Sequence, residues 1–393
     1  MNNSNSVPLS FEALEDGLSI SLSNEILYCI NGGAWETLLK GENTEEVKKG
    51  SVISFRHAKS LFASGSIGNF SINKKCNVYG ACSSIIPKVL GEKFMSSNLF
   101  YELFRGCDSI VDASKLELPA TTLAGSCYYA MFYDCTSLTT APELPATTLA
   151  ESCYENMFQY CTSLTTAPEL PATTLAESCY DSMFRGCTNL TVAPELPATT
   201  LAYSCYYSMF YNCSSLTTAP ELPATTLADY CYDGMFNGCT KLNYIKMLAT
   251  DISASNCLNY WVIGVASTGT FVKNPTMRTL PTATSSNLYA GIPSGWTVMN
   301  DGEESGGEDK IVNKLSYSIG SRDRITFTFQ YPVESDVDIY FMASGGGVET
   351  TSPITITKGN NTKTSLTNAS IQNDAITLTR IVPNEDSAYI YTW

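Results

Sequence analysis

A repeat of 26 residues is the feature that most limits how this chain can fold. One unit spans residues 144–169, and its equivalents fill residues 118–257 without insertion or deletion. A repeat of this length is one supersecondary unit, which buries its apolar face only by stacking on its neighbours. The sequence therefore predicts an elongated solenoid here, in which each unit contacts the unit before it and the unit after it.

Each unit divides into two halves with different patterns. Between Leu149 and Cys161 apolar residues recur in pairs every four positions, which favours one face of a helix. Thr148 and Glu151 form a T-x-x-E capping box, a usual start signal of a helix. Residues 164–170 are rich in threonine and contain a proline, which favours a short strand. Short strands that alternate with short helices in units of about 20 to 30 residues indicate a leucine-rich-repeat fold.

The unit C-T-S-L-T-T-A-P-E-L-P-A-T-T-L-A closely resembles BspA-like leucine-rich repeats, which occur in surface proteins of gut Bacteroidales and of their bacteriophages. Residues 8–17 and 30–35 resemble the β-rich module that precedes such repeats, and residues 291–298 resemble their closing segment. The resemblance covers roughly residues 8–298. It implies an architecture and a surface location, and it carries no catalytic residue over to this chain.

The complete chain is predicted to be multidomain and β-rich. Residues 1–90 form a small N-terminal β-sandwich, and residues 91–300 form the α/β solenoid with degenerate end units. Residues 301–310 are an acidic, glycine-rich linker, and residues 311–393 have the alternation and length of an immunoglobulin-like β-sandwich. The strands expected in the two flanking domains are residues 18–22, 26–30, 51–55, 325–331, 337–342, 354–357, 375–379 and 389–393.

Charge and hydropathy exclude several classes of partner. The net charge is −15, from 23 basic and 38 acidic residues, and no Lys/Arg-rich run exists, so nucleic acid is not an expected ligand. The longest apolar stretch, residues 260–266, is far shorter than the roughly 20 residues of a membrane span, so no membrane insertion is expected. The first residues lack the basic and apolar regions of a signal peptide, which predicts a protein made in a cytoplasm.

Ten of the 15 cysteines fall in the repeat, two per unit and eight residues apart. Two cysteines eight residues apart on a helix are beyond disulfide reach, but equivalent cysteines of neighbouring units are close enough for a staple or a soft-metal ladder. The favoured interpretation is a ladder of buried free thiols, because all ten lie on the apolar face. The pairs are Cys127/Cys135, Cys153/Cys161, Cys179/Cys187, Cys205/Cys213 and Cys231/Cys239.

Other chemically capable residues are interpreted as structural. Glu143, Glu169, Glu195 and Glu221 recur at one position, and neighbouring carboxylates could form a glycosidase pair. Their duplicated environments argue against it, since an acid and a base need different surroundings. His57 is the only histidine and has no motif around it. The sequence contains no metal motif and no nucleotide-binding motif, so no catalytic residue, metal or cofactor is predicted.

Three dipeptides in each unit vary while the residues around them stay constant. They occupy 125/126, 129/130 and 133/134 in the first unit and the same places in the later ones, which predicts a face opposite the apolar one. These 30 positions are rich in Tyr, Ser, Gly and Asn and contain no lysine, as in a binding surface. Relaxed constraint on exposed positions is the alternative. The candidate binding residues are Tyr129, Tyr133, Tyr160, Tyr203, Tyr207, Tyr211 and Tyr230.

These observations predict a non-enzymatic surface protein of a phage particle, such as a head or tail fibre or an adhesin, which recognises a host receptor or a glycan. A bacterial cell-surface adhesin of the same repeat family is the first alternative, and it would carry an export signal. A structural decoration of the capsid or tail is the second. The expected partners are other virion proteins or a host-surface receptor or glycan, with the chain itself a homo-oligomer.

Overall fold

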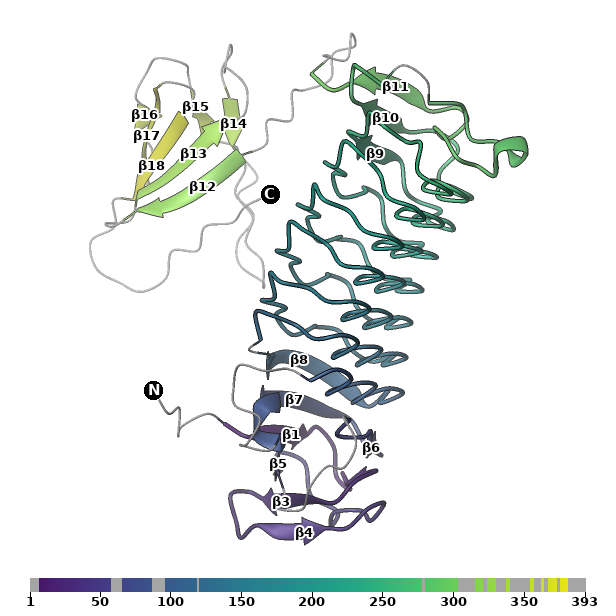
Figure 1. Ribbon diagram of the computed structural model, residues 1–393. Coiled ribbons are helices and arrows are strands. Elements are labelled where there is room, and N and C mark those ends of the chain that lie inside the picture. Colours follow the sequence, from purple (N-terminus) through teal and green to yellow (C-terminus); the bar gives the residue numbers. More distant parts are fainter. Residues whose placement is uncertain are drawn as a thin grey trace. The chain divides into compact units, whose positions relative to one another are not determined.

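The computed structural model describes residues 7–57, 66–86, 96–118, 120–277 and 280–302, together with the backbone of seven strands further on (Figure 1). The chain divides into two compact units, Met1–Glu303 and Glu304–Trp393. Both are β-rich. The predicted boundary between residues 90 and 91 lies inside the first unit, and most of the predicted linker and the strand expected at 389–393 lie outside the described residues.

The first unit begins with a six-stranded sheet whose order is β4-β3-β5-β1-β7-β8. Phe11, Phe55 and Phe70 form its aromatic core, with ring centroids 5.2 to 5.6 Å apart. A separate antiparallel pair joins β2 to β6. The elements are β1 (Leu9–Ala13), β2 (Ile20–Leu22), β3 (Ile26–Ile30), β4 (Glu36–Leu38), β5 (Val52–Arg56), β6 (Phe70–Ile72), β7 (Cys76–Ala81), the 3₁₀ turn η1 (Cys82–Ile85) and β8 (Ile110–Glu117).

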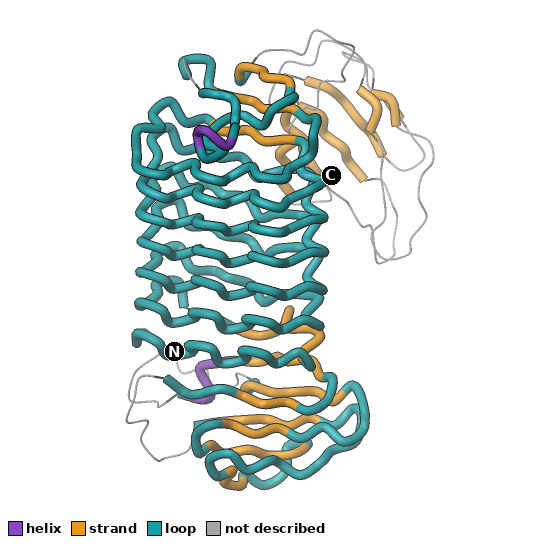
Figure 2. Tube along the Cα trace, turned by 90° about the vertical axis from the view of Figure 1, so that its right-hand side faces the viewer, coloured by secondary structure: helices purple, strands orange, loops and turns teal. Residues whose placement is uncertain are grey.

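The edge strand β8 connects this sheet to the repeat. It pairs in parallel with β7, and on its other side Asp112 forms a parallel bridge with Thr140 of the following unit. Further parallel bridges, such as Thr122 to Thr148 and Thr174 to Thr200, join equivalent residues 26 positions apart. The repeats therefore lie one above another as rungs of a stack (Figures 1 and 2). We call residues 138–148, and their equivalents in later rungs, the extended segment.

The predicted helix of each rung is wrong. Residues 125–135, and their equivalents 151–161, 177–187, 203–213 and 229–239, form consecutive turns, which we call the turn ribbon (Figure 2). Alternate backbone N–H groups bond within the rung, as from Tyr129 to the Ser126 carbonyl. The others cross to the next rung, as from Tyr128 to the Cys153 carbonyl (3.0 Å). An α-helix would keep all these bonds within one segment, so stacking has replaced the helix.

The stack ends in a small parallel sheet, in which β10 lies between β9 and β11. Two tryptophans fasten the last coils: Trp261 donates its indole N–H to the Gly291 carbonyl (2.9 Å), and Trp296 donates to the Ala266 carbonyl (2.7 Å). Trp261 stands where earlier rungs carry methionine, as at Met235, and it is fully buried. The elements are β9 (Tyr244–Met247), β10 (Thr270–Lys273), the 3₁₀ turn η3 (Ser285–Asn287) and β11 (Thr297–Asn300).

The second unit contains a five-stranded antiparallel sheet, β12-β13-β18-β17-β16, and a two-stranded antiparallel sheet, β14-β15. Four of its strands overlap predicted ones, at residues 325–331, 337–342, 354–357 and 375–379. The elements are β12 (Leu315–Gly320), β13 (Arg324–Phe329), β14 (Val337–Ile339), β15 (Ile354–Ile356), β16 (Thr362–Lys363), β17 (Thr367–Gln372) and β18 (Ala375–Arg380).

Candidate functional site: the outer face of the turn ribbon

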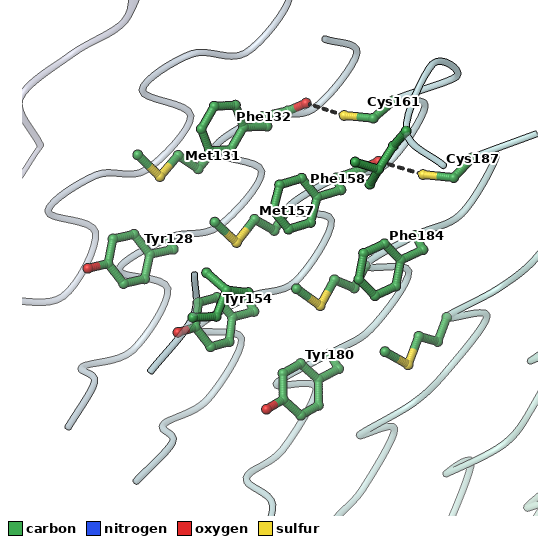
Figure 3. Packing of buried hydrophobic residues seen from close by; sticks show 14 of the residues in the cluster. Tyr128, Met131, Phe132, Tyr154, Met157, Phe158, Cys161, Tyr180, Phe184 and Cys187 are labelled. Atoms are coloured by element: carbon green, nitrogen blue, oxygen red, sulfur yellow. Dashed lines mark hydrogen bonds between the residues drawn. The ribbon is translucent and has the colours of Figure 1, made fainter. Parts of the chain in front are cut away.

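Aromatic ladders inside the stack hold the turn ribbon in register. Stacked tyrosines run from Tyr128 to Tyr232, with ring centroids 5.7 to 6.0 Å apart. A parallel row of phenylalanines runs from Phe132 to Phe236, at 5.6 to 5.8 Å (Figure 3). Each rung thus places its ring on that of the next. Because the ladders fix the inner residues, the residues between them on the ribbon face outward at constant intervals.

The repeat cysteines are buried free thiols, as predicted. All 15 cysteines of the chain are buried and unbridged. The second cysteine of each unit donates its S–H to a phenylalanine carbonyl of the preceding rung, as Cys161 does to Phe132 and Cys187 to Phe158 (both 3.1 Å; Figure 3). Burial raises the pKa of the Cys205 thiol to about 12, which suppresses the reactive thiolate. No group of three or more His, Cys, Asp or Glu side chains suited to a metal ion occurs among the described residues.

The backbone explains half of the variable positions. The second residue of every variable dipeptide has φ between 48° and 80°, in the left-handed region, as at Ser126, Ala130 and Asp134. Gly, Asn and Asp adopt this conformation most readily. The Gly and Asn content that the sequence suggested as a binding composition therefore also suits the turns at these positions, whereas serine and alanine, as at Ser126 and Ala130, adopt the same conformation without favouring it. Turn geometry thus accounts for the Gly and Asn residues, and the tyrosines and charged residues need a separate explanation.

All seven predicted tyrosines lie on the ribbon, outside the buried core. Tyr160 and Tyr203 are 38% and 48% exposed, and the other five are half-buried. Several make ring contacts between rungs: Tyr133 with Tyr160 at 5.6 Å, and Tyr203 with Tyr230 at 5.4 Å. These outer tyrosines are therefore grouped in contacting pairs and are not evenly spaced along the ribbon.

One further tyrosine escaped the sequence prediction. Tyr101 stacks on Tyr129, with ring centroids 4.7 Å apart and the rings 3° from parallel. Alignment of residues 99–107 with 127–135 already places Tyr101 at the position of Tyr129, so the signal was present.

Two of the predicted tyrosines occupy left-handed positions, where a bulky residue is unfavourable. Tyr160 has φ 63° and Tyr230 has φ 59°. In the rung after Tyr160 the equivalent residue is Gly186, where a Cβ atom would stand only 2.4 Å from the Tyr160 ring. The Tyr160 side chain thus leans over the next rung, and only glycine leaves room for it. A left-handed residue other than Gly, Asn or Asp costs about 1 kcal/mol, so the fold gains nothing from tyrosine here through its backbone.

Charged residues on the same face are distributed unevenly. Arg105 lies over the Tyr133 ring at 4.7 Å, and Arg185 lies over the Tyr211 ring at 4.4 Å. Burial raises the pKa of Asp181 to about 7 and that of Asp233 to about 6. For Asp181 the neighbouring Glu155 adds to the increase, and Arg185 opposes it. The sequence does not distinguish these carboxylates, because a half-buried acid and an exposed one look the same in it.

The other candidates lie elsewhere. Glu143, Glu169, Glu195 and Glu221 are exposed on the extended segment, and Glu221 pairs with Lys246 at 3.4 Å. His57 follows β5, and its backbone N–H donates to the Ser84 carbonyl (2.9 Å). Burial lowers the pKa of its imidazole.

No helix among the described residues has the length and apolar character needed to cross a membrane. Comparison with protein-family models, with curated proteins and with solved structures finds nothing that matches this chain.

Proposed function

We propose that this chain is a non-enzymatic recognition protein of the BspA-like leucine-rich-repeat type, displayed on a phage particle as a fibre or adhesin. In this proposal the stacked rungs are the solenoid that presents the binding surface, and residues 311–393 are an immunoglobulin-like domain. The outer face of the turn ribbon contacts a receptor on the host surface. Its tyrosines supply rigid, amphipathic contact area at a low entropic cost.

The observation that carries this proposal is the presence of tyrosine at left-handed positions. Gly, Asn and Asp fill the places equivalent to Tyr160 in other rungs, and Ser fills those equivalent to Tyr230, so smaller residues are compatible with the ribbon. Tyr160 and Tyr230 occupy them despite the cost, and each contacts another tyrosine of the same face. Strain retained at aromatic residues on the outer face of the ribbon supports a role in binding rather than in folding.

The test is the double variant Tyr160→Asn/Tyr230→Asn in the full chain. We expect its free energy of unfolding to stay the same or to rise by about 1 kcal/mol, because asparagine accepts the left-handed conformation. Attachment of the labelled protein to intact gut Bacteroidales cells, measured by flow cytometry, should fall. Thr147→Ser/Thr173→Ser, on the exposed extended segment, is the control and should attach like the parent protein.

Two results would contradict the proposal. Unchanged attachment of the folded double variant would leave the tyrosines without a binding role, as expected for a structural decoration. A loss of more than about 1 kcal/mol in stability would show that the tyrosines act in folding.

A further inference from the structure

The fourth rung is unlike the others, because tyrosine occupies all three outer positions of its ribbon: Tyr203, Tyr207 and Tyr211. Backbone hydrogen bonds fix which residues lie beside them. Ser178 donates to the Tyr203 carbonyl and Ser182 to the Tyr207 carbonyl, and Gly186 bonds in the same way to Tyr211. The row of tyrosines therefore lies between the ribbon of the third rung and that of the fifth.

The Tyr211 ring already binds a cation through its aromatic face. The guanidinium of Arg185, from the third rung, lies over it at 4.4 Å from the ring centroid. Arg105 covers Tyr133 in the same manner at 4.7 Å, so the arrangement occurs twice on this face. A cation over an aromatic face is attracted by the negative charge of the π system, and this attraction grows as water is excluded.

The other two rings have carboxylates where Tyr211 has a cation. By the same register, Tyr203 lies between Glu177 and Asp229, one rung to either side. Tyr207 lies between Asp181 and Asp233. Burial raises the pKa of its phenol, the charges of both carboxylates add to the increase, and Arg185 opposes it. The salt bridges formed by described residues involve Glu102, Glu221 and Asp301, and none includes these four carboxylates.

Asp233 is the most buried of the four carboxylates. It is only 8% exposed, and burial alone accounts for the rise in its pKa. No hydrogen bond to its carboxyl group is found in the described part of the chain. A carboxyl group on a largely buried residue gains from a cationic partner at its solvent-facing oxygens, because partial burial weakens its hydration.

We propose that Tyr203 and Tyr207, with the carboxylates on either side, bind the ammonium or guanidinium groups of a basic protein segment. Charge complementarity selects this occupant: the 30 variable positions hold seven carboxylates and one arginine. The inference rests on the proposed recognition function and names the chemistry of its partner. In this proposal a cationic group of the partner lies over each of these two rings, in the way that Arg185 of this chain lies over Tyr211.

The probe is fluorescent deca-lysine, added to the full chain at low ionic strength and followed by anisotropy. Binding is measured at pH 8.5, where Asp181 and Asp233 are ionised, and two triple variants each remove three negative charges from different faces. Asp181→Asn/Asp229→Asn/Asp233→Asn alters the proposed site, and Glu143→Gln/Glu169→Gln/Glu195→Gln alters the extended segment. We expect the first to weaken binding about tenfold and the second less than about threefold. Equal losses would overturn the proposal, because they would show attraction to net charge alone.

A second variant separates the rings from the charges. Tyr203→Leu/Tyr207→Leu keeps every carboxylate and should weaken deca-lysine binding about threefold to tenfold. Thermal unfolding confirms that each variant is folded, and fully acetylated deca-lysine should not bind. Unchanged binding by the leucine variant would overturn the proposal.

Cell attachment distinguishes this inference from the proposed function. If the leucine variant loses attachment while deca-lysine fails to bind the parent chain, the face is a recognition surface but its partner is not cationic. Binding of a neutral oligosaccharide such as maltoheptaose, lost in the same variant, would likewise overturn the cationic partner in favour of a glycan.

Discussion

The two exposed sides of each rung differ in how much they vary. On the extended segment the exposed Thr147, Thr173, Thr199 and Thr225 are identical, as are Glu143, Glu169, Glu195 and Glu221. On the turn ribbon, exposed and half-buried residues change from rung to rung over tyrosines, carboxylates and arginine. Exposure alone therefore does not explain the variation, because equally exposed residues across the same rung do not vary. The comparison indicates that the two sides meet different requirements.

The largest effect should follow from crowding the ribbon where Tyr160 leans over Gly186. Gly186→Ala places a side chain on a residue with φ 75° and brings its Cβ against the Tyr160 ring. We expect a loss of about 2 kcal/mol in the free energy of unfolding, measured by urea denaturation. In the background Tyr160→Gly the loss should shrink by about 1 kcal/mol, because the ring contact is gone. An equal loss in both backgrounds would show that only the backbone matters.

A pH-dependent effect should distinguish the half-buried carboxylate of the ribbon from exposed ones. Burial raises the pKa of Asp181 to about 7, so the folded state holds its proton more tightly than the unfolded state. Stability from this group is therefore complete at about pH 4 and is lost as the pH rises through 7. Asp181→Asn should stabilise the protein at pH 8, by an amount on the order of 2 kcal/mol, and have little effect near pH 4.

The control for Asp181 is Glu177→Gln, which changes an exposed carboxylate of the same rung and should stay within about 0.5 kcal/mol of the parent at both pH values. A stabilisation by Asp181→Asn that persists unchanged at pH 4 would contradict the assignment of its cause to burial.

Most of the interior could be predicted from the sequence. The Cys, Met and Phe residues of the repeat were assigned to the buried side, and the cysteines to free thiols. The helix was not predicted correctly, because pairs of apolar residues every four positions resemble a helical stripe. Four residues on an α-helix turn the chain by about 40° more than one full turn, so a constant four-residue period does not fit a helix well. Small or polar residues recur at every fourth position, as at Ser126 and Asp134, and they have positive φ in the structure. This recurrence is the sequence signal that indicates consecutive turns in place of a helix.

The candidate surface was predictable in part. The variable dipeptides located the tyrosines, and the 26-residue period places Tyr203 beside Asp229. Which carboxylates are buried could not be read from the sequence, because Asp229 is exposed and Asp233 is buried only four residues away. The burial of each carboxylate depends on how the ribbon folds. The predicted helix would have placed both of them on the same exposed face.

A smaller effect should come from the interior tyrosine ladder, which contrasts with the outer tyrosines. The hydroxyls of Tyr128, Tyr154 and Tyr180 are buried without a hydrogen-bond partner. Tyr154→Phe removes one of them and keeps the stacked ring, so we expect the free energy of unfolding to rise by about 1 kcal/mol. Thermal unfolding would show the increase. A decrease would mean that the hydroxyl has a partner, such as an ordered water molecule.

The most direct test of the central claim compares cell attachment after matched substitutions on the two sides. Tyr203→Ser/Tyr207→Ser/Tyr211→Ser changes the ribbon, and Thr173→Ser/Thr199→Ser/Thr225→Ser changes the extended segment. If the ribbon is the recognition surface, only the tyrosine variant loses attachment to Bacteroidales cells, while both unfold within about 1 kcal/mol of the parent. Equal attachment by two folded variants, or a loss confined to the threonine variant, would contradict this account.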